Sequence, residues 1–258
     1  MLRSLAQVTL LAGLLSAFEM HAQGTPSVSK SSEHLAETVV RMHQAWGSKA
    51  STPGTSLVIK ESTRSGQIIT YRLIASGMPK GAVYSLLAWP VTQKGPSEVL
   101  TGVTLDPSGL AVCAGTPGAC GSADKPDDPI DIPLRPVPGE PVRLGLVSAD
   151  GATKVFAKAV PLPLRGEDKG CSVEATLLTP AGELVLVTGS GFAANGDLTM
   201  DSSSGTESQR AKGKADADGH YVSALMPYTT GLAAGVASVK LISAQCAPSV
   251  KVAWGRRK

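Results

Sequence analysis

Residues 141–160, PVRLGLVSADGATKVFAKAV, are the stretch that decides the fold class. Two runs rich in Val, Leu and Ala flank Ala149-Asp150-Gly151, and an Asp-Gly pair between such runs favours a tight hairpin turn. The pattern predicts two antiparallel strands joined at this turn.

The second half of the chain continues in the same style, with short strand-like segments separated by Gly, Pro, Asn and Asp. From Cys171 the candidates are SVEATLLT, ELVLVTGS, DLTMDS, ESQRAKGKA, HYVSALM, GVASVKLISA and PSVKVAW. About seven such strands are the number expected of an immunoglobulin-like (Ig-like) sandwich. We therefore predict an Ig-like β-sandwich domain over residues 170–255.

The preceding segments QIITYRLIA, AVYSLLAWPV and VLTGVTLDPSGLAV predict further strands, the last folded around a turn at Asp106. An irregular stretch follows from Ala114 to Pro138, and the prolines at 161 and 163 end this part of the chain. We predict a first β-sandwich domain over residues 56–163. The whole chain is then all-β, with two tandem Ig-like β-sandwich domains, and 28 Gly, 18 Pro and only 4% aromatic residues suit that class.

One amphipathic helix is predicted in the segment 24–55, which otherwise forms a linker. In SSEHLAETVVRMHQAWG an apolar stripe recurs at helical spacing, and Gly47 ends it. The stripe consists of Leu35, Val39, Met42 and Trp46. We expect this helix to dock on the first domain; the alternative is a helix that binds a partner or a second copy.

The first 23 residues predict a secretory signal peptide. Arg3 supplies a positive start, and an apolar run extends from Val8 to Phe18 before small residues at Ala17 and Ala22. This run is shorter than the roughly 20 residues that span a bilayer, and no later segment reaches that length. We therefore expect a secreted or periplasmic protein with no transmembrane segment.

Four cysteines in an exported chain favour disulfides, and three pairings are possible. The spacing favours Cys113–Cys120, around a segment of turn formers, and Cys171–Cys246, across the second domain. Zinc is the competing interpretation, but the spacing does not suit it and no complementary pair of ligands is present.

The formal net charge of +3 equals that of the last three residues, Arg256, Arg257 and Lys258. A neutral body with a basic tip does not form the basic face that nucleic-acid binding needs. We therefore expect no nucleic-acid partner.

Two motifs carry a family resemblance. Leu186-Val-Thr-Gly-Ser-Gly-Phe192 and Ala215-Asp-Ala-Asp-Gly-His-Tyr221 resemble a turn-and-strand pattern of bacterial extracellular Ig-like modules, over roughly the last 90 residues. The resemblance implies that Phe192 plugs the core of the sandwich. It also implies a spacer, adhesion unit or binding platform, because such modules share no active site.

Candidate binding residues are few. The densest carboxylate group, Asp124, Asp127, Asp128 and Asp131, predicts a solvated loop or a weak calcium site, and the loop from Cys113 to Asp131 is the first candidate binding surface. Trp89 is either a core residue or an exposed platform for sugars. Asp216-Ala-Asp218-Gly219 favours a hairpin turn over a calcium loop.

No catalytic, metal or cofactor motif stands out, and the histidines are not spaced for a shared site. We therefore expect an exported, non-catalytic interaction or structural module whose partner is another envelope or extracellular protein. A carbohydrate-binding protein that uses Trp89 is the second hypothesis, and a secreted hydrolase without a recognisable motif is the third.

Overall fold

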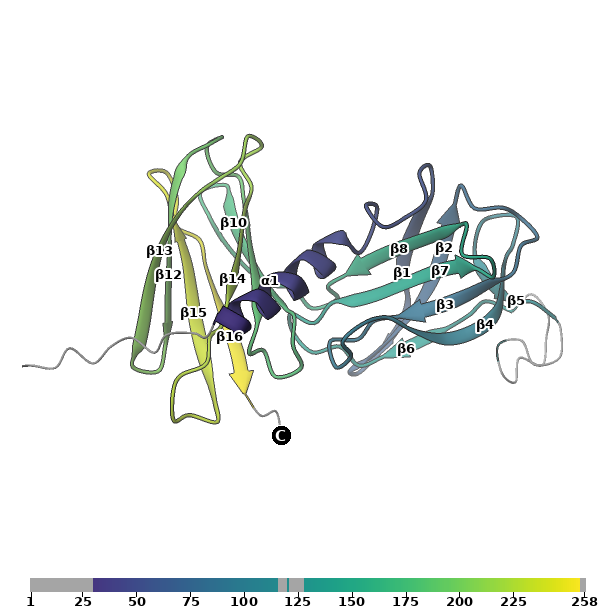
Figure 1. Cartoon of the computed structure of the whole chain (residues 1–258), viewed down its shortest axis with the longest axis horizontal. Helices are drawn as coiled ribbons and strands as arrows, with labels where there is room; N and C mark the ends of the chain where they lie inside the picture. Colours follow the sequence, from purple (N-terminus) through teal and green to yellow (C-terminus); the bar gives the residue numbers. More distant parts are fainter. Residues whose placement is uncertain (1–29, 116–119, 121–127, 256–258) are drawn as a thin grey trace, which may run out of the picture.

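The computed structural model describes residues 30–115, 120 and 128–255 (Figure 1). These residues form one α-helix and sixteen β-strands, and all strand pairs are antiparallel within four sheets. The predicted all-β class is therefore confirmed for this part of the chain. The predicted signal peptide, residues 1–23, lies outside the described residues.

Two sheets form the first sandwich. The smaller has the strand order β1 (Ser56–Ser65), β2 (Ile68–Ser76), β6 (Ile132–Leu134). The larger has the order β5 (Ala111–Cys113), β4 (Ser97–Leu105), β3 (Tyr84–Ala88), β7 (Val142–Ser148), β8 (Lys154–Ala159). Alternate residues of each strand face the space between the sheets, and Leu73, Val103 and Leu146 are among the fully buried ones.

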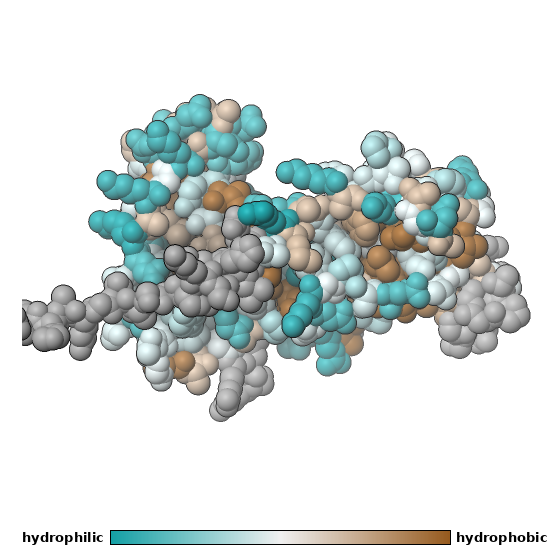
Figure 2. Space-filling model, viewed as in Figure 1, coloured by the Kyte–Doolittle hydropathy of each residue, from teal (hydrophilic) through white to brown (hydrophobic). Residues whose placement is uncertain are grey.

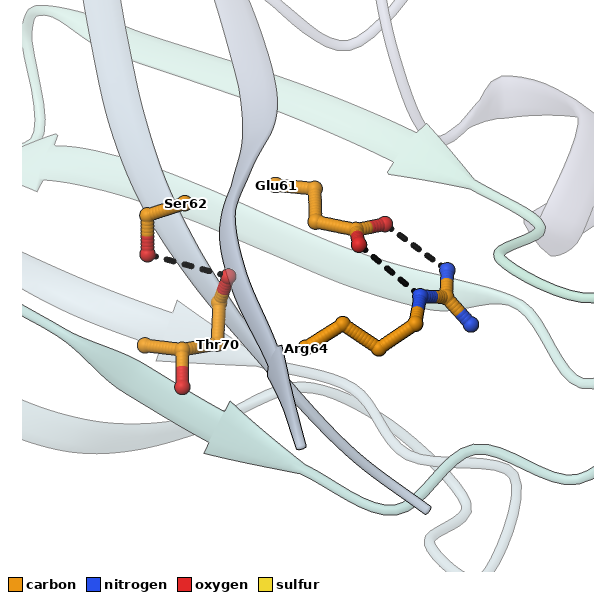
Figure 3. A network of polar contacts seen from close by, with 4 residues as sticks. All are labelled: Glu61, Ser62, Arg64 and Thr70. Carbon is orange, nitrogen blue, oxygen red and sulfur yellow. Dashed lines mark hydrogen bonds and ion pairs between the residues drawn. The ribbon is translucent and has the colours of Figure 1, made fainter. Parts of the chain in front are cut away.

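The β1–β2 hairpin contains a bulge that Figure 3 shows from close by. Glu61 pairs with Tyr71 and Thr63 with Thr70, so Ser62 is the extra residue, and its hydroxyl donates a 3.2 Å hydrogen bond to the Thr70 carbonyl. Next to the bulge the Arg64 guanidinium donates to both carboxylate oxygens of Glu61, at 2.9 and 2.8 Å, and lowers the pKa of Glu61.

The second sandwich also has two sheets, of four strands each. One has the order β14 (Tyr221–Leu225), β11 (Val185–Ser190), β10 (Cys171–Leu177), β9 (Leu164–Asp168). The other has the order β13 (Glu207–Lys214), β12 (Asp197–Ser204), β15 (Ala234–Ile242), β16 (Ser249–Gly255). The seven strands predicted from Cys171 onward are confirmed as β10 to β16. Phe192 lies in the shared core of these sheets, as the resemblance implied.

The two sandwiches share one strand connectivity. In the first, β2 lies between β1 and β6, while β3 lies between β4 and β7, and β7 pairs with β8. In the second, β11 lies between β10 and β14, while β12 lies between β13 and β15, and β15 pairs with β16. The sequence shows no repeat, so the shared order is visible only in the structure.

Two segments for which no strand was predicted contain one. Residues 164–169 lay outside both predicted domains, but β9 pairs with β10 across a two-residue turn, where Lys169 and Gly170 both have positive φ. That geometry is typical of a tight hairpin turn. The stretch from Ala114 to Pro138 likewise contains β6, which pairs with β2. Its prolines are compatible with an edge strand, and they hid it from pattern analysis.

The helix α1 (Lys30–Ala45) contacts both sandwiches, which corrects the expectation that it docks on the first alone (Figure 1). Val39 and Val40 pack on a small apolar cluster of the second sandwich: Leu178, Leu184, Leu186 and Met226. Just beyond the helix, the Trp46 indole packs on the first sandwich and donates a 2.9 Å hydrogen bond to the Ala157 carbonyl. The helical segment therefore bridges the two units.

The residues after the helix cover one edge of the first sandwich. The Thr52 amide donates to the Lys154 carbonyl at 2.8 Å, and the Ser51 hydroxyl accepts from the Phe156 amide at 2.9 Å. These bonds satisfy backbone groups along the free edge of β8. On this side β1 also lies next to β8, so the sandwich is closed here. On the opposite side the two sheets are joined by a bridge between Ile74 and Leu110.

Candidate binding groove

A groove of about 330 Å³ opens at one end of the first sandwich. Its walls are mostly apolar, and they come from the ends of four strands and from the loop before β7. The apolar lining includes Val99, Ile132, Leu134, Val142 and Leu144. The charged lining consists of Arg135, Glu140 and Arg143. Figure 2 shows hydrophobic side chains gathered on the visible face of the first sandwich, whereas the upper part of the second is mainly hydrophilic.

Strand length explains why the sandwich is open here. The short strand β5 pairs with β4 only at Val103–Leu105, and the Ala111 carbonyl accepts from the Ile130 amide at 3.0 Å. Beyond Ile130 the chain changes sheets, because β6 pairs with β2 instead. The start of β4 and the short strand β6 are therefore left on opposite sides of an unfilled gap between the two sheets.

The start of β4 is an unpaired sheet edge. Within the described residues no strand lies on the outer side of Ser97–Leu100, although the next residue, Thr101, accepts a 3.0 Å hydrogen bond from the Cys120 amide. Ser97, Glu98 and Leu100 pair with β3, and Val99 is the extra residue of a bulge. Val99, on this stretch, is 54% exposed and lines the groove. An exposed apolar residue on an unpaired edge is what β-strand addition by a partner requires.

Trp89 directly follows β3 and lines the groove, but it is only 4% exposed. This burial favours the core interpretation of Trp89, and a sugar platform there stays a prediction. The ring packs edge-on against Trp46, with centroids 5.5 Å apart, and the Trp46 ring in turn packs on Phe156 at 4.5 Å. The indole nitrogen of Trp89 donates to the Gln93 carbonyl at 2.9 Å.

Arg143 joins this aromatic cluster to the groove. Its guanidinium carbon lies 4.2 Å from the centroid of the Trp89 ring, which is a cation–π arrangement. Arg143 is 3% exposed, yet its Nε has no hydrogen-bond partner, and no described carboxylate lies within ion-pairing distance. Burial lowers its pKa to about 10, opposed by the charge of Glu140. The residue remains a cation at neutral pH.

Two further basic groups lie near Arg143. Lys158 donates a 3.2 Å hydrogen bond to the His43 carbonyl, and burial, followed by the charge of Arg143, lowers the pKa of Lys158. Burial, followed by the charges of Lys158 and Arg143, lowers the pKa of His43 to about 3. His43 is therefore neutral at physiological pH, and the region under the end of the helix has an excess of positive charge.

The predicted aspartates have separate positions. Asp131 is exposed and forms an ion pair with Arg72, at 2.8 Å between Oδ1 and Nε. Asp128 is exposed, and its backbone carbonyl accepts from the Cys113 amide at 3.3 Å. Asp124 and Asp127 lie outside the described residues. The two described aspartates therefore have separate contacts. Ile132, directly after Asp131, lines the groove.

The cysteines lie in the predicted pairs at disulfide distance. The Cα atoms of Cys113 and Cys120 are 5.7 Å apart, and those of Cys171 and Cys246 are 6.2 Å apart. The first pair joins the last residue of β5 to Cys120, and the second joins the start of β10 to the turn before β16.

Asp216 lies in a tight turn, as predicted, but the turn joins β13 to β14, which belong to different sheets, so it closes no hairpin. Its Oδ1 accepts from the backbone amides of Asp218 and His220, at 3.0 and 2.8 Å, and Gly219 has a φ of +75°. The carboxylate therefore accepts its hydrogen bonds from backbone amides of the turn itself. No cluster of three or more His, Cys, Asp or Glu side chains suited to a metal ion occurs in the described part of the chain.

Sequence reasoning missed most of the groove residues. Val99, Leu134 and Arg143 are ordinary strand residues by pattern, and only the fold brings them together. The one available signal was the proline-punctuated run IPLRPVPGEP from Ile132 to Pro141, because repeated prolines at strand ends mark an edge.

Comparisons with known proteins give no family for this chain. No protein-family model matches the sequence, and no curated protein matches it. Among the helices of the described residues, none is long and apolar enough to cross a membrane.

Proposed function

We propose that the chain is an exported, non-catalytic interaction module of two Ig-like domains that binds another envelope or extracellular protein through the groove of its first sandwich. The groove carries the proposal, because it combines an apolar lining with the unpaired edge of β4 at Ser97–Leu100. A larger cavity of about 490 Å³ in the second sandwich, which includes Asp201, Gln209 and Lys240, is lined only by polar and charged residues.

The strand order supports the Ig-like assignment. Constant-type Ig domains place strands A, B and E in one sheet and C, F and G in the other, and variable-type domains add C′ beside C. The strands β10, β11 and β14 match A, B and E, while β13, β12, β15 and β16 match C′, C, F and G. The strands β1, β2 and β6 and the strands β4, β3, β7 and β8 match in the same way.

Export is supported by the predicted signal peptide together with two cysteine pairs at disulfide distance. Disulfides persist outside the reducing cytoplasm. An envelope or extracellular partner follows from that compartment.

Site-specific photocrosslinking in the native cells tests this function. A photoreactive residue at Val99, 54% exposed at the groove, is compared with the same residue at Val236, 57% exposed on β15 of the second sandwich. We expect one defined partner protein crosslinked at Val99 and absent at Val236. Equal capture at both positions, or no adduct at Val99, would reject the groove as the binding surface.

A further inference from the structure

We propose that the groove binds an extended peptide segment that carries apolar side chains at alternate positions and one acidic side chain, whose carboxylate pairs with Arg143. This inference rests on the proposed function and adds the chemistry of the partner. The segment would lie along the outer edge of Ser97–Leu100, on the same side of β4 that β5 covers at Val103–Leu105.

The backbone of the partner is inferred from the edge of β4. An extended peptide satisfies the unpaired N–H and C=O groups of an edge, and it places every second side chain on one face. That face would meet Val99 on one wall and Ile132 and Leu134 on the other. Apolar side chains at alternate positions therefore suit these walls.

A comparison with β13 shows that the edge of β4 is unusual in this protein. The strand β13 also lies at the edge of its sheet, but its residues are almost all exposed and include Arg210, Lys212 and Lys214. Basic side chains on an edge strand discourage pairing with another chain. The free part of β4 has a single charged residue, Glu98, and lies beside an apolar groove.

The acidic side chain is inferred from Arg143. A buried cation without a counter-ion is costly, and the cost falls when a carboxylate binds it. Arg143 lines the groove, is 3% exposed and has an Nε without a hydrogen-bond partner. Glu140, the one acidic residue in the lining, accepts from the Val137 amide at 3.1 Å and forms no ion pair with Arg143. Arg135 adds a second positive charge to the lining.

Selection from random peptides tests the proposal without a known partner. A phage-displayed library of random 12-residue peptides is selected on the full chain as recovered from the expressing cells. We expect selected peptides with apolar residues at alternate positions and one Asp or Glu. In the resynthesised peptides, Glu→Gln or Asp→Asn should weaken binding by about 10-fold or more, since a charge-assisted hydrogen bond is lost.

Three variants of the protein locate the contact. Val99→Asp places a negative charge on the exposed groove wall and should weaken the binding of acidic peptides by about 10-fold or more. The matched control Val236→Asp should leave their binding unchanged. Arg143→Met should abolish the preference for Glu over Gln. Because Arg143 packs on Trp89, the Arg143→Met variant is first checked for a native near-ultraviolet circular dichroism spectrum. Val99→Asp tests whether the peptides bind in the groove independently of that variant.

The outcomes separate the two proposals. Peptides that bind equally well as Glu and Gln forms, and that Val99→Asp still blocks, would overturn the carboxylate contact and leave the groove intact. Peptides unaffected by Val99→Asp would overturn both. If the library yields no peptide while oleate binds and Val99→Asp blocks it, the groove is a lipid site and the inference is wrong.

Discussion

The rings of Trp46 and Trp89 meet edge-on, with centroids 5.5 Å apart, although Trp46 directly follows the helix and Trp89 directly follows β3. Through this contact the helical segment, which also packs on the second sandwich, is fixed to the first. The aromatic cluster therefore supports both the junction between the sandwiches and the wall of the groove next to Arg143.

Replacing Trp46 should destabilise this arrangement. Trp46→Ala removes a ring that is 7% exposed and should lower the free energy of unfolding by about 3–5 kcal/mol, as large-to-small core substitutions do. Urea unfolding followed by circular dichroism measures the loss. Met42→Ala, in the last turn of the preceding helix and 39% exposed, should change stability by less than about 0.5 kcal/mol. Equal effects of the two variants would mean that the helix is not anchored by Trp46.

The two cysteine pairs should differ in their contribution to stability. Loop entropy grows with the length of chain that a disulfide closes, and the separations are 75 residues for Cys171–Cys246 and 7 for Cys113–Cys120. The loop-entropy relation gives about 4.5 and about 2.4 kcal/mol respectively. Paired Cys→Ala variants, compared by urea unfolding, should reproduce that order. A larger loss from the short loop would contradict it.

Stability should fall as the medium becomes mildly acidic, because of His43. The pKa of His43 is about 3 in the folded chain, whereas an unfolded chain has a value near 6.5. Below about pH 6.5 the unfolded state takes up a proton that the folded state does not, so stability is lost as pH falls towards 3. The slope approaches about 1.4 kcal/mol per pH unit.

Unfolding measured between pH 7 and 5 checks this slope, since most carboxylates remain ionised there. His43→Gln should flatten the profile. A wild-type profile that is already flat would show that His43 is not held neutral by its surroundings.

Gly166 on β9 should not tolerate a side chain. A Cβ atom there would collide with the backbone of Ser249 on β16, and backbone cannot move aside cheaply. Gly166→Ala should therefore destabilise the second sandwich by roughly 1–3 kcal/mol. Gly95→Ala, where a Cβ would meet nothing within 4 Å, is the matched control. Unchanged thermal unfolding of Gly166→Ala would show that β9 does not lie against β16.

The regular elements were predictable where local signals agree. The hairpin at Asp150 and the seven strands from Cys171 onward follow from alternating apolar residues and turn chemistry, which act within a few residues. The strand β9 was missed because its polar residues lack that alternation, although Lys169-Gly170 forms a hairpin turn. The groove was not predictable, because it arises where β5 ends early and β6 changes sheets.

The environment of single side chains was harder still to predict from the sequence. The residues next to Trp89 in the sequence are strand-like, and such a pattern is compatible with a ring that faces either the core or the solvent. In the structure the Trp89 ring is buried against Trp46. Whether Arg143 has a counter-ion is equally hard to predict, because that depends on residues far away in the sequence.

Hydrogen exchange tests whether a partner binds along the edge of β4. Exchange of the full chain is compared with and without the partner that Val99 captures, and the exposed edge strand β13 (Glu207–Lys214) serves as the internal reference. We expect that the amides of Ser97–Leu100 exchange more slowly in the complex while those of β13 do not change. Slowed exchange at β13 with no change at Ser97–Leu100 would contradict it.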